Sequence, residues 1–154
     1  MKEFFLSAAC FLWVIFSFSQ KQPNTVGKWN VVSVADGEFF MDFKKDSISI
    51  NEELKSNYPD DASVKRKKSS VENQYGKTYF VFEADGTFKK LQADKIKISG
   101  TYKIDFPGKG TIRISYKDES GKQIIDDCNF FDIPPFMLFS MNNNSVRFML
   151  ERVK

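Results

Sequence analysis

The feature that most constrains the fold is a series of short segments, from residue 77 onward, in which apolar and polar side chains alternate. TYFVFEADGTFKKL contains two such segments around the Asp-Gly pair at residues 85–86, and Asp-Gly between strand-like runs is a strong hairpin signal. In TIRISY, Ile112, Ile114 and Tyr116 alternate with other residues, as expected of a half-buried strand. The second half of the chain is therefore predicted to form antiparallel strands joined by short turns.

Eight main strands are expected in total. The first begins at Trp29, and the other seven follow Lys77. A sheet built from successive hairpins avoids exposed edges when it rolls up on itself. The sequence therefore predicts an all-β fold, an eight-stranded antiparallel up-and-down barrel.

Residues 51–76 differ from the rest of the chain, because they are polar and poor in strand formers. Asp60 or Asp61 can cap a helix that begins near Ala62. Val64 and later apolar residues recur at roughly helical spacing. We therefore expect a short helix inserted after the first strand.

The first nineteen residues have the composition of a secretory signal peptide. Lys2 supplies a positive charge, residues 4–18 are almost entirely apolar, and Ser-Phe-Ser at 17–19 offers the small-x-small pattern that signal peptidase needs. This segment is too short for a comfortable membrane span. We expect residues 1–19 to be cleaved, residues 20–154 to form one domain, and the protein to be periplasmic or secreted without a transmembrane segment.

Two alternatives for the N-terminal segment are a lipoprotein signal at Cys10 and an uncleaved anchor.

Cleavage after residue 19 would leave Cys128 as the one remaining cysteine, so no internal disulfide could form. The formal net charge of +3 is mild. It indicates no general affinity for nucleic acid or for an anionic membrane.

The chain contains no histidine, which is the commonest general base and metal ligand. A Ser-His-Asp or Cys-His site and a histidine-bearing zinc site are therefore excluded. No serine is followed three residues later by lysine, and no glycine-rich phosphate loop is present. We expect neither an enzyme nor a bound cofactor nor a metal site.

Three charged or nucleophilic features remain. Asp126 and Asp127 are adjacent in a strand, so their side chains point to opposite faces; we expect them to mark an irregular or exposed strand end rather than a polar group for a ligand. Acids near Cys128 would raise the pKa of its thiol, which disfavours a reactive thiolate. The basic run at residues 65–68 is interpreted as a solvated helix face rather than a surface for lipid headgroups.

Several short motifs together resemble the lipocalin-like domain of small exported bacterial proteins, a calycin-type barrel. They are Gly-Lys-Trp at residues 27–29, FEADGTF, SGTYKI, and a closing strand that ends in Glu151 and Arg152. The resemblance covers about residues 25–153, and the long polar stretch at 51–76 departs from it. It implies that the tryptophan closes the narrow end of the barrel and that an arginine of the last strand packs across it.

Geometry identifies the arginine. In an up-and-down barrel the last strand runs antiparallel to the first, so its end lies beside Trp29. Arg152 is near that end and shares a face with Phe148, whereas Arg147 lies at the other end and on the opposite face. We expect Gly27, Trp29 and Arg152 to form the closure, with the guanidinium over the indole. The alternative is an ordinary core tryptophan beside a solvated arginine.

The inward face of the barrel is the candidate binding site. Eight strands enclose just enough space to be filled by side chains or to hold one small ligand. The resemblance and this apolar lining together predict an exported protein that binds a lipid-like or aromatic molecule inside the barrel, with tyrosine hydroxyls as polar handles. The candidate lining residues are Phe80, Phe82, Phe88, Ile98, Tyr102, Ile104, Ile112, Ile114, Tyr116, Phe148 and Leu150.

Two other classes of protein remain open. One is a solid-core barrel that acts as an interaction or structural module of the cell envelope, which exposure of Phe39, Phe40 or Met41 would favour. The other is an outer-membrane barrel, which the C-terminal Lys154 and the lack of aromatic girdles disfavour.

Overall fold

A computed structural model describes residues 25–105, 110–118, 120–141 and 145–154. The expected signal peptide, residues 1–19, lies outside these ranges. The elements in chain order are β1 (Gly27–Ala35), β2 (Phe39–Asp42), β3 (Ser47–Ile50), the 3-10 helix η1 (Glu52–Asn57), α2 (Asp61–Tyr75), β4 (Thr78–Phe82), β5 (Thr87–Gln92), β6 (Lys95–Asp105), β7 (Thr111–Lys117), β8 (Gln123–Ile133), β9 (Phe136–Met141) and β10 (Val146–Arg152).

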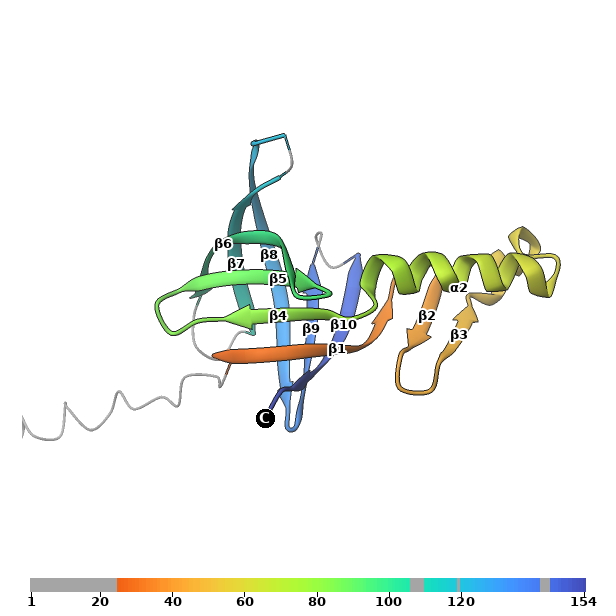
Figure 1. Ribbon diagram of the computed structural model, residues 1–154, viewed down its shortest axis with the longest axis horizontal. Coiled ribbons are helices and arrows are strands. Elements are labelled where there is room, and N and C mark those ends of the chain that lie inside the picture. The colour runs from red at the N-terminus through yellow and green to blue at the C-terminus, as the bar shows by residue number, and fades with distance from the viewer. Residues whose placement is uncertain (1–24, 106–109, 119, 142–144) are drawn as a thin grey trace, which may run out of the picture.

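Eight of the strands, β1 and β4 to β10, form a closed antiparallel barrel (Figure 1). From β4 to β10 each strand pairs with its neighbour in sequence, and β10 pairs back with β1. Trp29 lies opposite Arg152 and Val34 opposite Phe148 in this closing pair. The predicted eight-stranded up-and-down barrel is confirmed.

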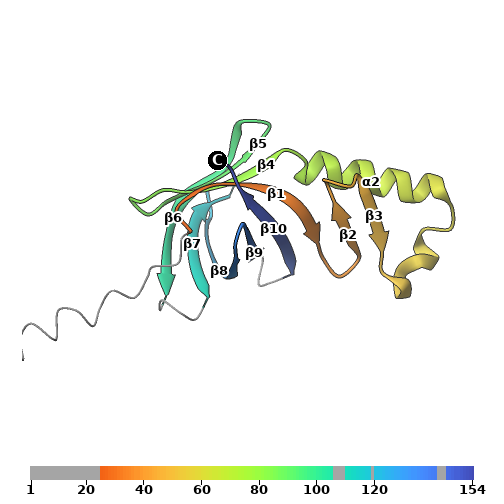
Figure 2. The same ribbon diagram turned by 90° about the horizontal axis from the view of Figure 1, so that it is seen from below.

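The strand β1 belongs to two parts of the sheet. Its first half, Gly27 to Asn30, pairs with β4, whereas Ser33 to Ala35 pair with β2. A register shift between Val31 and Ser33 in the pairing with β10 separates the two halves, as a bulge that bends a strand does. The β2–β3 hairpin therefore extends the sheet beyond the barrel (Figure 2).

Helix α2 lies along the hairpin and ends at the barrel (Figure 2). The Asp60 carboxylate accepts a hydrogen bond from the Ser63 backbone, and the Ser63 side chain is bonded in return to the Asp60 backbone. This capping box satisfies backbone donors that the first turn leaves free. Val71 and Tyr75 are the buried residues of the helix. The expected helix between the first two barrel strands is confirmed, with Asp60 as its cap.

The core fills the barrel and continues under α2. Inward-facing residues of every barrel strand contribute to it, joined by Phe39 and Met41 of β2 and by the two buried residues of α2. Alternate residues of the strands are exposed, as in β7, where Ile112 and Ile114 are buried and Arg113 between them is not. One continuous core therefore holds the barrel, the hairpin and the helix together.

Candidate functional site

Aromatic rings in mutual contact occupy the middle of the barrel. The ring of Phe80 lies 5.2 Å from those of Phe139 and Phe148, and 6.0 Å from that of Phe88. The ring of Phe82 lies 5.4 Å from that of Phe88 and 5.7 Å from that of Phe139. These separations are those of packed aromatic pairs. We call these five residues the ring cluster.

The candidate lining residues all belong to this core or pack against it. Phe80, Phe82, Phe88, Ile112, Ile114, Phe148 and Leu150 are at most 2% exposed, and Tyr102 is 9% exposed. Ile98, Ile104 and Tyr116 are partly buried against the same core. The Tyr102 hydroxyl, expected as a polar handle, donates a 2.9 Å hydrogen bond to the Glu83 carbonyl oxygen, so the backbone already uses it.

Trp29 and Arg152 meet at one end of the barrel. The indole is 3% exposed, and its Nε1–H donates a 2.8 Å hydrogen bond to the Thr25 carbonyl oxygen. The Arg152 guanidinium lies over the indole, 5.6 Å from its centroid, and donates to the Val26 carbonyl oxygen at 2.9 Å. Gly27 lies directly beside this arginine, because a Cβ there would come within 3.3 Å of Nη2.

The C-terminal end of α2 covers part of the opposite end. Tyr75 meets the ring of Phe148 edge-on at 5.7 Å. Gln92 of β5 donates a 2.5 Å hydrogen bond to the Asn73 carbonyl oxygen of the helix. The polar segment at residues 51–76 thus contributes an aromatic side chain to the barrel core.

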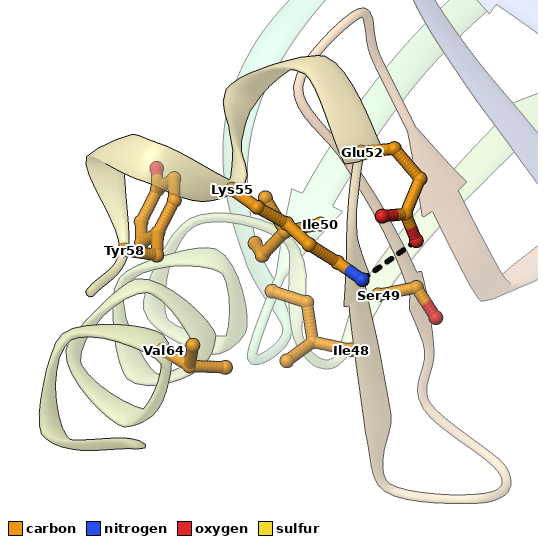
Figure 3. Close-up of a pocket in the computed structure, with 7 residues that line it drawn as sticks. All are labelled: Ile48, Ser49, Ile50, Glu52, Lys55, Tyr58 and Val64. Atoms are coloured by element: carbon orange, nitrogen blue, oxygen red, sulfur yellow. Dashed lines mark hydrogen bonds and ion pairs between the residues drawn. The ribbon is translucent and has the colours of Figure 1, made fainter. Parts of the chain in front are cut away.

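A hollow lies outside the barrel, between β3, η1 and the first turns of α2 (Figure 3). Its volume is about 420 Å³. Ile48 and Ile50 of β3 face Val64 of α2 across it, and Tyr58 closes one side (Figure 3). At the rim, Lys55 forms a 2.6 Å ion pair with Glu52. The lining is thus apolar at its centre and charged at its edge.

A small polar cluster ties this hollow to the body of the protein. Glu38 accepts hydrogen bonds from the Tyr58 hydroxyl and from Lys67 Nζ, the latter at 2.5 Å. Lys67 Nζ also lies 4.8 Å from the centroid of the Phe39 ring. The hydrogen bonds from Lys67 and Tyr58 lower the pKa of the Glu38 carboxyl. We call Glu38, Tyr58 and Lys67 the hairpin–helix cluster.

The acid pair of β8 does not mark a strand end, so that prediction was wrong. Both residues lie within β8, where Asp126 is 4% exposed on the inward face and Asp127 is exposed. Asp127 forms a 2.7 Å ion pair with Arg113 of β7. The two carboxylates point to opposite faces as the alternation required, but the strand continues past them, which carries Asp126 into the interior.

The other two features that the sequence singled out are Cys128 and the basic run at residues 65–68. Cys128 is fully buried, and burial, followed by the nearby Asp126, strongly raises the pKa of its thiol. The basic run divides between two faces of α2, because Lys67 and Lys68 pair with acids whereas residues 65 and 66 are exposed.

Sequence reasoning missed several inward-facing residues. Phe139 of β9 belongs to the ring cluster. The sequence predicts a strand here, but it did not indicate which residues of that strand point inward. Lys90 shares a face with Phe88 by simple alternation, but the Lys-Lys pair in which it lies is typical of a solvated position. Thr78, fully buried at the start of β4, gave no signal.

Within the described part of the chain, no group of three or more Cys, Asp or Glu side chains is arranged to hold a metal ion. No helix among the residues described is both long enough and apolar enough to cross a membrane.

No family model and no curated protein matches the chain. Among solved structures, it is similar to a DUF4847 family protein from Bacteroides vulgatus ATCC 8482, with a TM-score of 0.51 and 16% sequence identity. The similarity covers 84% of this chain and 94% of that protein. At this identity the similarity shows a shared fold, and a fold does not determine a function.

Proposed function

We propose that this protein is an exported, lipocalin-like, non-enzymatic barrel that binds a small hydrophobic molecule, and that the molecule occupies the hollow between the hairpin and α2. The hollow has the volume typical of small-molecule sites, which run from about 300 to 1,000 Å³. Its apolar floor offers burial worth roughly 25 cal/mol per Å² before the costs of association.

The observation that carries this choice of location is the contrast between the two apolar regions. Inside the barrel, the rings of the ring cluster already contact one another at 5.2–6.0 Å. A ligand there would have to displace packed side chains, and interiors are close-packed. The hollow needs no such displacement, because Ile48, Ile50 and Val64 already face an open volume.

Native mass spectrometry tests the binding. The protein is purified without detergent from the periplasm of an expression host and exposed to a lipid extract. We expect a bound mass of a few hundred daltons that is lost on denaturation. Val64→Arg, which places a charge in the hollow, should abolish the adduct. Ser70→Arg introduces the same side chain on an exposed part of the same helix and should retain it.

Equal adducts on both variants would place the ligand elsewhere. A bare protein mass with every extract would refute ligand binding. The same spectra test export, because cleavage after Ser19 gives a chain that begins at Gln20, whereas the full-length mass would contradict a cleaved signal peptide.

A second candidate function, a protein-interaction module, is favoured by exposed apolar residues on the outer face of the barrel. Leu138 of β9 pairs with Phe131 of β8 on one side and with Met149 of β10 on the other. Phe131 is 59% exposed and Met149 is 39% exposed, and Phe40 of the hairpin is 46% exposed. Phe39 and Met41, the other two residues expected to indicate such a surface, are buried. Capture of an envelope protein by the wild type but not by Phe131→Asp would favour this function.

A further inference from the structure

The hollow beside α2 lies along a free edge of the sheet. Strand β3 stands last in the strand order and pairs with β2 alone, so its other edge has no neighbouring strand within the described residues. Three consecutive residues of β3, Ile48, Ser49 and Ile50, line the hollow. Because successive side chains of a strand point to opposite faces of the sheet, a space that borders all three residues extends around this edge.

The hydrogen bonds of β2 show which side of that strand bonds with β3. The Phe43 N–H, directly after β2, donates a 3.0 Å hydrogen bond to the Val32 carbonyl oxygen of β1. In antiparallel sheets, successive residues of a strand direct their backbone groups to alternate sides. The odd-numbered residues of β2 therefore bond with β1, and the even-numbered residues Phe40 and Asp42 bond with β3.

The partners of Phe40 and Asp42 are the two serines of β3. The backbone N–H and C=O groups of Ile48 and Ile50 therefore point away from β2, toward the free edge and the hollow. Within the described part of the chain, no other segment forms hydrogen bonds with them. Unpaired donors and acceptors along a sheet edge are a template on which another extended chain can add.

We propose, on the basis of the function given above, that the bound molecule is a short extended peptide with apolar side chains at alternate positions, which pairs with β3 as an added strand. A peptide supplies amide donors and acceptors at the spacing of Ile48 and Ile50, as in other cases of strand addition. Peptide residues opposite these two isoleucines share their face of the sheet. Their side chains therefore enter the hollow and face Val64 (Figure 3).

The length of the edge favours a short peptide over the strand of a second protein. Strand β3 has four residues, and the helix η1 begins at Glu52, two residues after Ile50. A longer strand would therefore find no extended backbone to pair with beyond β3. A peptide of three residues already covers the positions opposite Ile48 and Ile50, and the hollow of about 420 Å³ has the volume of a small-molecule site.

The test is hydrogen exchange of the backbone amides, followed by NMR, in the full protein titrated with acetyl-Leu-Ser-Leu N-methylamide. In the free protein, Ile48 and Ile50 should exchange rapidly, and the two serines of β3, which bond with β2, should exchange more slowly. At saturation the peptide should slow exchange at Ile48 and Ile50 by at least about ten-fold. Slow exchange at both before peptide is added would show that the edge is already paired, for example with a second copy, and would overturn the proposal. Absence of binding, or unchanged exchange at saturation, would also overturn it.

Methylated peptides separate strand pairing from nonspecific apolar binding. N-methylation of the second leucine removes an N–H that donates to β3, so we expect binding at least about ten-fold weaker. N-methylation of the central serine alters an N–H that points away from β3 and should change the affinity by less than about three-fold. Equal affinities of the two methylated peptides would contradict the strand pairing.

Toluene, which is apolar and has no amide group, distinguishes this proposal from the binding function on which it rests. If toluene shifts the methyl signals of Ile48 and Val64 but the peptide does not bind, the hollow is an apolar site without strand pairing, and only the proposal of a peptide ligand fails. If toluene, lipid extracts and the peptide all fail to bind, both proposals fail. Binding of the peptide that Val64→Arg abolishes and Ser70→Arg retains would support both.

Discussion

At the scale of single residues, Arg152 does more than cover an indole. It lies over the Trp29 ring, donates to the Val26 carbonyl oxygen, and fills the space beside Gly27. Gly27 has φ of +140°, a conformation that residues with a Cβ avoid. Gly27 and Trp29, at the start of the first strand, thus meet an arginine from the end of the last strand.

We predict that Arg152→Met lowers the free energy of unfolding by about 1 kcal/mol, because it removes one cation–π contact and one hydrogen bond. Urea denaturation followed by circular dichroism measures the change. Arg147→Met, an exposed arginine of the same strand, should change stability by less than about 0.5 kcal/mol. Equal effects of the two substitutions would show that Arg152 is a solvated terminal residue.

Cys128 is predicted to be unreactive in the folded protein. The thiolate is the nucleophilic form, and burial keeps the thiol protonated at neutral and mildly alkaline pH. In a chain of residues 20–154, which lacks Cys10, iodoacetamide at pH 8 should therefore leave the native protein unmodified, as intact mass shows, and should add one label at Cys128 in urea. Rapid labelling without denaturant would contradict the buried position.

The side of the sheet to which each strand residue points was the property that the sequence predicted most directly. Alternation alone places Phe80, Phe82 and Phe88 on buried faces, and the structure buries all three. The same rule places Lys90 and Asp126 inward, but their charge favours the opposite interpretation. Residues of this kind are poorly predicted because their cost of burial depends on partners that no local pattern shows.

At the scale of elements, the hairpin–helix cluster joins three segments. Glu38 precedes β2, Tyr58 follows η1, and Lys67 lies in α2. The sequence predicted the helix from its cap and its spacing. It could not predict the position of the helix over the hairpin, because that depends on contacts between residues about 20 to 30 positions apart.

This cluster predicts a dependence of stability on pH. The bonds from Lys67 and Tyr58 lower the pKa of Glu38 in the folded state, so the cluster stabilises the fold above the ordinary carboxyl pKa. That contribution is lost as the pH falls through the lower, folded value. Glu38 is partly exposed, at 35% of its side chain, so we expect a loss below about 1 kcal/mol.

Glu38→Gln should therefore be less stable than the wild type at pH 7 and should approach it at pH 3. Thermal denaturation at both values measures the two differences, and Glu53→Gln in the exposed η1 controls for the removal of a carboxylate. A difference that stays constant between pH 7 and pH 3 would contradict the contribution of the charged form.

At the scale of the whole molecule, the number of expected strands was enough to predict that the barrel closes. Eight segments with an alternating pattern and short turns leave few arrangements other than a sheet closed by its first and last strands. The hollow was beyond prediction, because it arises where the long insertion between β1 and β4 fails to fill the space beside β3. Its lining comes from β3, η1, α2 and the segment between the two helices, none of which carries a binding motif.

The most direct test of the proposed binding site uses methyl NMR on protein with labelled isoleucine and valine. The probe is an apolar compound recovered from the native mass spectra. We predict shifts at Ile48, Ile50 and Val64, which line the hollow, and none at Ile112 and Ile114, which lie inside the barrel. Shifts at Ile112 and Ile114 with none at the hollow would contradict the proposed site and would show that the ligand enters the barrel among the rings.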